Sequence, residues 1–275
     1  MNFKKLIASL QRQSQVHVIA VAGKGGVGKS VISANLALAC AEQGAQVLLF
    51  DANLGLGNLD LLMGVQVKHT ISDVLSGECQ LAEVLLDAAH GVKILPAAIG
   101  DEHIASLSPL ELSGLIHAFS ELPKVPDVFV VDTPSGIAEH NIHFMTAAQN
   151  VLLVVNDELP SLIAALAFIK VLSSHSITNF HIVINQVPTE AMGQQLFYQL
   201  VADAASFDNV TLDLAGIILN DPRMHESITA QTPLMMLFPH SYAANGFRNL
   251  AGSLFNWKKS ASSGSAYFVE QLASI

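Results

Sequence analysis

The sequence is poor in charged side chains, and those it has are mostly acidic. Charged residues make up 13% of its 275 residues, and 23 Asp and Glu against 13 Lys and Arg leave a formal net charge of −10. Proteins that bind nucleic acid without sequence preference neutralise phosphates with many basic side chains. The charge balance therefore predicts that the protein does not bind nucleic acid directly.

Cysteines are scarce as well. Cys40 and Cys79 are the only two, they are far apart, and no CxxC pair occurs. This usage is typical of a reducing compartment and offers no zinc or iron–sulfur framework. The eleven histidines, His69 among them, do not stand at metal-ligand spacing, apart from the pair His140 and His143. We expect most of them to be surface residues or hydrogen-bonded interior residues.

Long uninterrupted apolar runs are missing. The N-terminal stretch "MNFKKLIASLQRQSQ" begins like a signal peptide, but its apolar run stops at Gln11. The most apolar segment, residues 151–172, contains four residues that interrupt it and make it unsuited to span a bilayer: Asn156, Asp157, Glu158 and Pro160. The sequence thus predicts a soluble cytoplasmic protein.

What the sequence does contain is a regular alternation of short apolar runs and helical patterns. The runs are nearly continuous in Val, Ile and Leu, as expected for strands covered on both faces; they are 16–22, 46–52, 92–97, 127–133, 150–156, 181–187 and 213–219. Helical patterns lie at 30–43, 108–121, 158–174, 192–204 and 242–257. This order predicts a single α/β domain with a mostly parallel twisted sheet of about seven to eight strands, flanked by helices on both faces.

The stretch "GKGGVGKS", residues 23–30, joins the first predicted strand to the first predicted helix. It satisfies G-x-x-x-x-G-K-[ST], in which glycines let backbone N–H groups point at phosphate oxygens and the helix N-terminus adds positive charge. Lys29 is expected to reach the β- and γ-phosphates, and the Ser30 hydroxyl to bind Mg²⁺. The predicted nucleotide-binding residues here are Gly23, Lys24, Gly25, Gly26, Val27, Gly28, Lys29, Ser30 and Val31.

The loop carries a second lysine, Lys24, which a phosphate loop already holding Lys29 does not need. From its place at the strand exit we expect Lys24 to point outward, toward a phosphate held by another subunit; a solvated surface lysine is the alternative. The pattern "KGGVGKS" resembles the deviant phosphate loop of the MinD/ParA family, whose members dimerise face to face around two ATP molecules. The resemblance implies that Lys24 crosses to the partner's nucleotide.

The resemblance extends over residues 16–252. The segments "LLFDANLGLGNLDLLMGV", "ISDVLSGE", "ILPA", "LSPLELSGLIHAFSEL", "VVDTPSGI" and "SLIAALAFIKVL" occur in the family's order and spacing. They are most similar to the FleN/FlhG branch, the flagellar-number regulators. The resemblance implies a P-loop NTPase that takes ATP or ADP with Mg²⁺ and forms an ATP-dependent homodimer.

Carried over by position, the resemblance assigns roles to residues that follow predicted strands. Asp51 and Asn53 lie in the first switch beside the γ-phosphate, Asp132 holds a Mg²⁺-bound water, and Gly136 belongs to the second switch. The residues themselves support the role of Asp132, because an aspartate preceded by four apolar residues would be a costly buried charge without a cation nearby. A helix N-cap is the alternative for Asp132.

Two further residues are assigned to the adenine ring. Asn185 matches the family position whose amide contacts adenine, which suits a group that both donates and accepts hydrogen bonds. A turn-forming asparagine is the alternative. Asp221 falls in the loop that packs near the base, although Leu219 replaces the family's usual proline two positions earlier.

Asn53 departs from the family pattern, which has an aspartate there to orient and polarise the attacking water. Asparagine can hydrogen-bond a water but cannot accept its proton. Because phosphoryl transfer depends largely on positioning, hydrolysis need not vanish. Loss of general-base help costs on the order of 10²–10⁴-fold, so the sequence predicts slow turnover.

The ends of the chain are expected to lie outside the ATPase domain, which we place at 16–257. Residues 1–15 form an N-terminal extension that lacks the branch's Asp-Gln-Ala motif, and 258–275 form a flexible linker with a short apolar tail. The stretch 246–260 has apolar residues at helical spacing, with Trp257, Lys258 and Lys259 at its end. A final helix packed on the sheet is the favoured interpretation, and a weak membrane-binding helix is the alternative.

The function predicted from these features is a MinD-like ATP switch that controls flagellar number or placement through a flagellar regulator or assembly protein. It would act in the cytoplasm, at the inner face of the membrane or at a cell pole. Four alternatives stay open: a regulator of division, a ParA-type partitioner of DNA, an ATP-using small-molecule enzyme, and an ATP-binding scaffold that has lost hydrolysis.

Overall fold

The computed structural model describes residues 16–257, except 54–56, 98–125 and 149. These residues form an eight-stranded sheet in the order β3-β4-β2-β5-β1-β6-β7-β8, in which only β3 is antiparallel to its neighbour. The strands are β1 (His17–Gly23), β2 (Val47–Asp51), β3 (Leu86–Asp87), β4 (Lys93–Leu95), β5 (Val128–Asp132), β6 (Asn150–Val155), β7 (Asn179–Val187) and β8 (Thr211–Leu219). The predicted fold class is confirmed.

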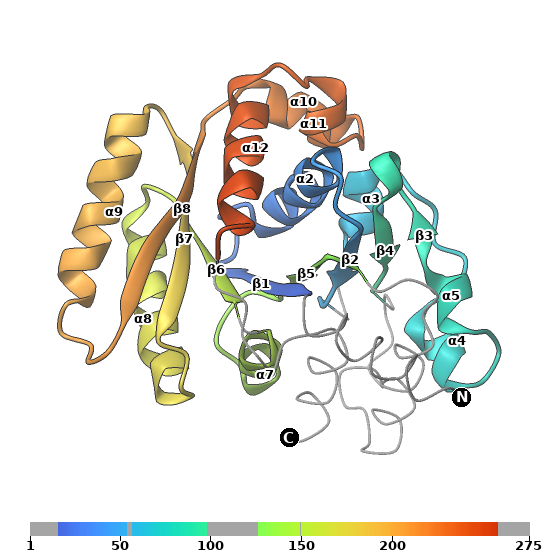
Figure 1. Ribbon diagram of the computed structural model, residues 1–275, viewed down its shortest axis with the longest axis horizontal. Helices are drawn as coiled ribbons and strands as arrows, with labels where there is room; N and C mark the ends of the chain where they lie inside the picture. The colour runs from blue at the N-terminus through green and yellow to red at the C-terminus, as the bar shows by residue number, and fades with distance from the viewer. Residues whose placement is uncertain (1–15, 54–56, 98–125, 149, 258–275) are drawn as a thin grey trace.

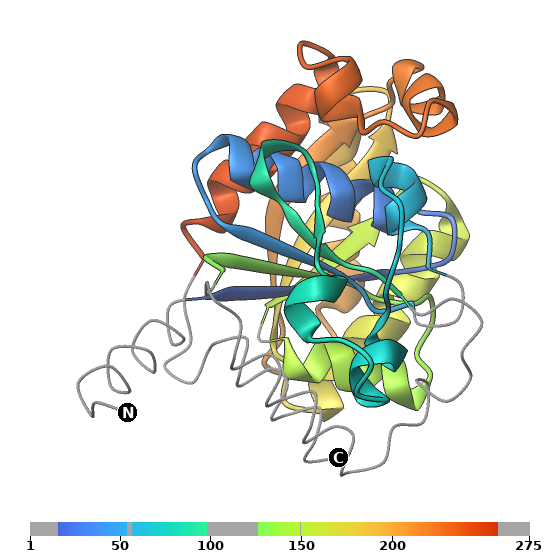
Figure 2. The ribbon, with the colours of Figure 1, turned by 90° about the vertical axis from the view of Figure 1, so that its right-hand side faces the viewer.

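Helices cover both faces of this sheet (Figures 1 and 2). One face is covered by α2 (Lys29–Glu42), α3 (Leu59–Met63), α10 (Arg223–Thr229), α11 (Leu234–Leu237) and α12 (Tyr242–Leu254). The other is covered by α4 (Ile71–Leu75), α5 (Leu81–Val84), α7 (Glu139–Ala147), α8 (Leu159–Ser174) and α9 (Glu190–Ala204). A short 3-10 turn, η1 (Ala89–Gly91), precedes β4.

The seven predicted strands are all present, each within two residues of its expected ends. Strand β3 was not predicted, because two residues on the sheet edge are too few to show a pattern. Short helices such as α3, α4 and α11 escaped prediction for the same reason. The helix predicted at 108–121 lies outside the described residues.

Strand β1 shows why these sequences favour a two-sided sheet. All seven of its residues are buried, and their side chains alternate between the two cores. Val18 and Ala20 pack in the core beneath α7, α8 and α9, whereas Ile19 and Val21 pack in the core beneath α2 and α12. A continuous apolar run is therefore needed at this position, since neither face of the strand meets solvent.

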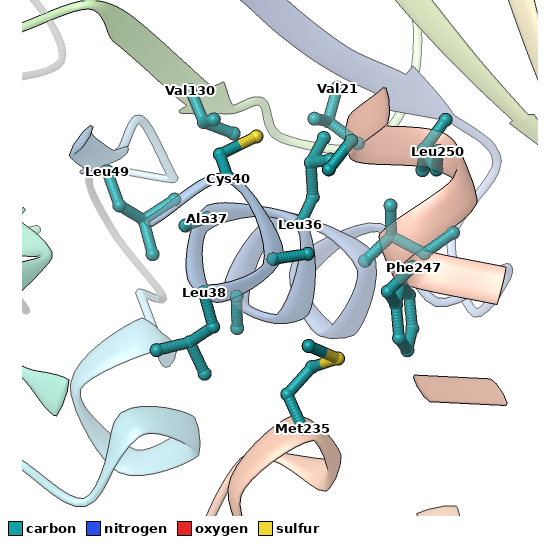
Figure 3. Close-up of a cluster of buried hydrophobic side chains, with 14 of the residues drawn as sticks. Val21, Leu36, Ala37, Leu38, Cys40, Leu49, Val130, Met235, Phe247 and Leu250 are labelled. Carbon is teal, nitrogen blue, oxygen red and sulfur yellow. The ribbon is translucent and has the colours of Figure 1, made fainter. Parts of the chain in front are cut away.

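Helix α2 is buried on nearly all sides, because the sheet lies under it and α11 and α12 lie against its outer sides (Figure 3). Leu36 and Leu38 are fully buried, as are Phe247 and Leu250 of α12 that pack in the same core. Burial of a side chain of this size contributes about 1.5–3 kcal/mol. This packing fixes the first turn of α2, which begins at Lys29, against the sheet.

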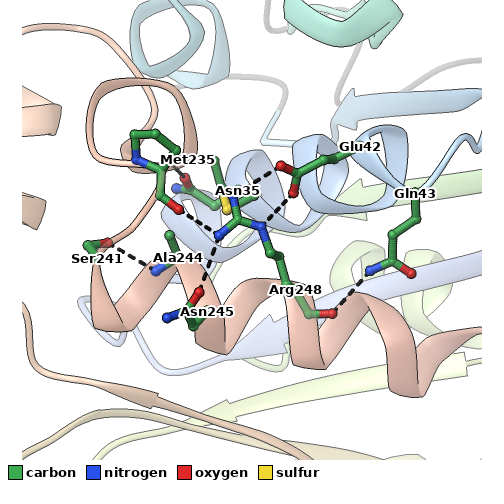
Figure 4. A network of polar contacts seen from close by, with 9 residues as sticks. Asn35, Glu42, Gln43, Met235, Ser241, Ala244, Asn245 and Arg248 are labelled. Atoms are coloured by element: carbon green, nitrogen blue, oxygen red, sulfur yellow. Dashed lines mark hydrogen bonds and ion pairs between the residues drawn. The ribbon is translucent and has the colours of Figure 1, made fainter.

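Polar contacts hold the same helices in register (Figure 4). The Arg248 guanidinium on α12 donates two hydrogen bonds to the Glu42 carboxylate, from Nε at 2.7 Å and from Nη2 at 3.0 Å. The Met235 backbone N–H donates to Asn35 Oδ1 of α2 at 3.0 Å. Helix α11 is therefore tied to the middle of α2, and α12 to its end.

The C-terminal helix packs on the sheet, as the favoured interpretation predicted. Phe247, Leu250 and Leu254 of α12 are fully buried, and Trp257 stacks on the His181 ring with 3.6 Å between centroids. These apolar groups are therefore used inside the fold. Lys258, Lys259 and the rest of the tail lie outside the described residues. Among the helices that are described, none has the length and apolar character needed to cross a membrane.

The stacked pair gives a prediction about acid stability. Burial lowers the pKa of His181 from 6.5 to about 4, against the opposing effect of Asp213 on the neighbouring strand. Since the folded state favours neutral His181, stability is lost as pH falls from 6.5 toward 4. At about 1.4 kcal/mol per pKa unit, the loss is about 2–3 kcal/mol.

Urea unfolding of the wild type and of His181→Phe at several pH values measures this effect. The phenylalanine keeps a ring against Trp257 but cannot be protonated, so the variant should lose less stability over the same range. His175→Ala, which removes an exposed histidine, is the control and should behave like the wild type. Identical pH profiles for wild type and His181→Phe would contradict the prediction.

Candidate functional site

The predicted site residues converge at one edge of the sheet, where the parallel strands end. Gly23 ends β1, Asp51 ends β2, Asp132 ends β5, Asn185 lies near the end of β7, and Asp221 follows β8. Helix α2 leads from β1 across one face to β2, whereas α7 leads from β5 across the opposite face to β6. The two connections leave the neighbouring strands β1 and β5 in opposite directions along the sheet. Ligands bind in open α/β sheets at a reversal of this kind.

The glycines of the loop are required by its backbone. Gly26 and Gly28 have φ of 88° and 94°, a region that other residues rarely adopt. A Cβ on Gly28 would also lie 2.6 Å from Asn185 Nδ2, whereas one on Gly26 would meet nothing within 4 Å and would fill the open side of the loop. The loop then enters α2 with no side chain capping the helix, so its first N–H groups are available to an anion.

Lys29 is buried and lies folded over the loop. Its Nζ donates to the Lys24 carbonyl at 3.2 Å and to Ser135 Oγ at 2.6 Å. Burial lowers the pKa of Lys29, and the nearby Asp132 partly opposes that effect. The lysine therefore links the phosphate loop to the second switch, and a phosphate group would offer its charge a stronger partner than a hydroxyl and a carbonyl.

Asp132 is buried beside this lysine and beside a second carboxylate. Ser33 Oγ donates to Asp132 Oδ1 at 2.8 Å, and Ser30 donates a further hydrogen bond. Asp51 is its direct partner across the β2–β5 pair. Burial raises the pKa of Asp132 to about 7, the Asp51 charge adds to the rise, and the serines and Lys29 oppose it. A bound cation would therefore stabilise the charged form of Asp132.

Asp51 organises the first switch through backbone hydrogen bonds. Its Oδ1 accepts from the Asn53 N–H at 3.1 Å, and its Oδ2 accepts from the N–H groups of Asn58 at 2.9 Å and Leu59 at 3.1 Å. Burial raises its pKa, and these three hydrogen bonds oppose the rise. The carboxylate thus anchors the start of α3 beside Asp132, its neighbour across the β2–β5 pair.

Several residues that the sequence analysis missed shape the second switch. Asn141 Nδ2 donates to the carbonyls of Ser135 at 3.0 Å and Gly136 at 3.2 Å, and Thr133 Oγ1 donates to the Val21 carbonyl at 2.8 Å. Ser33 could have been predicted as a site residue, because it lies three residues after Ser30 and so shares its helix face. Asn141 carried no signal, since its role depends on how α7 returns toward the loop.

Lys24 is partly exposed at the rim of the site. Its Nζ lies 3.6 Å from Glu158 Oε2, and both side chains are substantially exposed, at 37% and 57%. Exposed ion pairs of this kind contribute about 0–1 kcal/mol. The structure thus pairs Lys24 weakly with a carboxylate of its own chain, and its contact with another subunit's phosphate stays a prediction.

The two residues assigned to adenine have structural partners of their own. Asn185 Nδ2 donates to the Val27 carbonyl at 2.8 Å, which ties β7 to the phosphate loop. Asp221 accepts from the Arg223 N–H at 3.1 Å and from the Ala243 N–H at 3.5 Å, so it joins the starts of α10 and α12. Both side chains are buried beside the loop edge, and their contact with a base stays a prediction.

The donor set fits a nucleotide triphosphate with Mg²⁺. The open loop, the free helix N-terminus and Lys29 offer positive charge to phosphates, while Ser30 and the Asp132 carboxylate offer oxygen ligands of the kind Mg²⁺ prefers. The pair of buried carboxylates supplies the negative charge that a divalent cation would balance. Ser30 and Asp132 are hydrogen-bonded to each other, and their role in holding Mg²⁺ stays a prediction.

Comparisons with known proteins agree with this geometry. The model of the CobQ/CobB/MinD/ParA nucleotide-binding domain matches residues 18–236. The antiactivator FleN of Pseudomonas aeruginosa is 42% identical over 261 residues, which cover 94% of this chain and 93% of FleN. The flagellum site-determining protein YlxH of Helicobacter pylori is 30% identical, covering 92% of this chain and 87% of YlxH.

The fold agrees with that of solved relatives. The septum site-determining protein MinD of Pyrococcus horikoshii, solved in complex with Mg-ADP, superposes with a TM-score of 0.69 and 26% identity, over 86% of this chain and 94% of that one. Sequence and fold thus point to the same family as the loop and its two lysines. The chain belongs to the MinD/ParA family of P-loop ATPases, within the branch that contains FleN.

Proposed function

We propose that the protein is an ATP-dependent switch that dimerises around ATP, hydrolyses it slowly and regulates the number or placement of flagella. The observation that carries the proposal is the site itself: a buried Lys29 over the phosphate loop, paired Asp51 and Asp132, and a weakly held Lys24 at the rim. The flagellar role is supported by the two relatives, FleN and YlxH, whose names refer to antiactivation and to flagellar siting.

ATP and Mg²⁺ would be held by the residues already described. The loop N–H groups and Lys29 bind phosphate oxygens, Ser30 and Asp132 hold the metal, and Asn185 and Asp221 lie on the side where the base would bind. When bound, Mg²⁺ would neutralise part of the phosphate charge. Because Ser135 is a hydrogen-bond partner of Lys29, a phosphate that takes over this lysine would also release the second switch.

The two switches would report the nucleotide to a partner. Asp51 anchors α3 through Asn58 and Leu59, and Asn141 holds the loop before α7 through Ser135 and Gly136. A bound γ-phosphate that took over Lys29 would free Ser135, which Asn141 also contacts. Such a local change can shift the surface that a flagellar regulator contacts.

Among the alternatives, division control and DNA partitioning share this site and differ in partner. The net charge of −10 disfavours DNA as that partner. A scaffold without hydrolysis differs only in turnover, which depends on Asn53. An ATP-using small-molecule enzyme would not need Lys24. Placement at a cell pole or the inner membrane face remains part of the proposal.

The second lysine gives the sharpest test. Light scattering should show a monomer with ADP and a dimer with a non-hydrolysable ATP analogue. Lys24→Ala should bind the analogue but stay monomeric, because a charge buried at the dimer interface loses its partner, at a cost of roughly 2 kcal/mol or more. Glu158→Ala is the matched control: it frees Lys24 from its ion pair, so dimerisation should persist.

Either of two results would contradict the dimer proposal. One is a wild-type protein that stays monomeric when saturated with the analogue. The other is a Lys24→Ala protein that dimerises as well as the wild type.

Asn53 gives a separate test of turnover. Asn53→Asp restores a carboxylate that can polarise the attacking water, so the ATP hydrolysis rate should rise on the order of 10²-fold. Its backbone hydrogen bond to Asp51 does not involve the changed group, so the loop should keep its anchor. Asn179→Asp adds the same charge at the exposed start of β7, at the opposite edge of the sheet, and should leave the rate near that of the wild type. Equal rates for wild type and Asn53→Asp would show that the asparagine does not slow hydrolysis.

A further inference from the structure

A cluster of three metal-ligating side chains lies outside the nucleotide site, around the short helix α4 (Figure 1). It consists of His69, Asp73 and Cys79, whose ligand atoms all lie within 4.8 Å of one another. His69 Nδ1 is 3.6 Å from Asp73 Oδ2. His69 is exposed and the other two are half-buried, so the group is reachable from solvent.

The local backbone brings these three residues together. Thr70 and Asp73 form a capping box at the start of α4, in which Asp73 Oδ2 accepts from the Thr70 N–H at 2.7 Å. After the helix, Gly77 adopts φ of 80° and turns the chain back. The Cys79 N–H then donates to the Asp73 carbonyl at 3.3 Å. The thiol is thus returned to the first turn of the helix by hydrogen bonds, before any ligand binds.

The surroundings of the thiol are acidic. Asp73, Glu78 and Glu83 lie close enough to the thiol to act on it electrostatically. These negative charges favour a cation beside it. A metal ion that binds here would displace the thiol proton to solvent and bond to the resulting thiolate, so the charge is balanced by the metal.

We propose that His69, Asp73 and Cys79 form a binding site for a zinc-type divalent cation. An imidazole nitrogen, a carboxylate oxygen and a thiolate sulfur are together a zinc or cobalt ligand set, whereas Mg²⁺ and Ca²⁺ prefer oxygen alone. With three protein ligands, the fourth tetrahedral position goes to water. Asp73 can serve both the metal and the Thr70 N–H, because a carboxylate has about four acceptor positions.

The site shares no residue with the nucleotide site, so the two can be tested separately. It lies in the segment between α3 and α5, which follows the first switch. A metal there would crosslink the start of α4 to the turn after it. The expected consequence is a more stable 69–79 segment, at no cost to ATP binding.

Cobalt is the spectroscopic probe for such a site. The untagged, full-length, reduced protein, titrated with Co²⁺, should show a near-ultraviolet sulfur-to-cobalt charge-transfer band that saturates at one ion per chain. Zn²⁺ should abolish the band by competition. Cys79→Ser should remove the band, and His69→Ala should weaken Zn²⁺ binding by at least about 10-fold.

Matched controls assign the signal. Cys40→Ala changes the other cysteine, which belongs to α2 and is fully buried in the core, and should keep the band. His175→Ala removes an exposed histidine elsewhere and should keep the Zn²⁺ affinity. Each titration is repeated with excess Mg²⁺, which prefers oxygen ligands and should leave the band unchanged.

Any of three results overturns the proposal: no sulfur-to-cobalt band in the wild type, a band that survives in Cys79→Ser, or equal Zn²⁺ affinity in the wild type and His69→Ala. A band that excess Mg²⁺ abolishes would also overturn it, because the proposed ligand set prefers Co²⁺ and Zn²⁺ to Mg²⁺. A failure of the dimer or hydrolysis tests leaves the cobalt titration unaffected, since no ligand is shared.

Discussion

The structure depends on the placement of opposite charges inside an apolar sheet edge. Asp51 and Asp132 end neighbouring strands side by side, and Lys29 begins the helix that packs above them. Each of the three is buried, and burial shifts the pKa of each toward its neutral form. Such groups are costly unless they are paired or bind an ion. The site is thus built to gain from a phosphate and a cation.

Hydrophobic packing holds that arrangement in place. Helix α2 is enclosed by the sheet, α11 and α12, so Lys29, Ser30 and Ser33 on its first turns cannot move far from Asp132 (Figure 3). The loops that follow β2 and β5 are held by a few polar side chains instead, among them Asp51 and Asn141. A rigid core and hydrogen bonds that can exchange therefore meet at one edge of the sheet. A nucleotide-dependent switch needs both.

Much of this was predictable from local patterns. The strands were predicted because both faces of a strand such as β1 are buried, so that Ile19, Val21 and their neighbours are all apolar. The loop was predicted because its glycines and Lys29 together form a pattern that binds phosphate. Strand β3 was missed because edge pairing of two residues leaves no periodicity. The partners of Asn141 and Glu158 were missed because each contact joins segments that are far apart in sequence or that meet only after the chain turns.

The amino-acid sequence was enough to determine the order of strands and helices, the phosphate loop with its second lysine, and the family. Each of these depends on patterns of residues that are close together in the chain. Tertiary packing alone decided that Asp51 and Asp132 lie side by side, that Lys29 contacts Ser135, and that Trp257 covers His181. The spacing of His69, Asp73 and Cys79 gave no metal signal, since a turn at Gly77 closes it. Side chains brought together by folding carry no periodicity, so only the folded backbone reveals them.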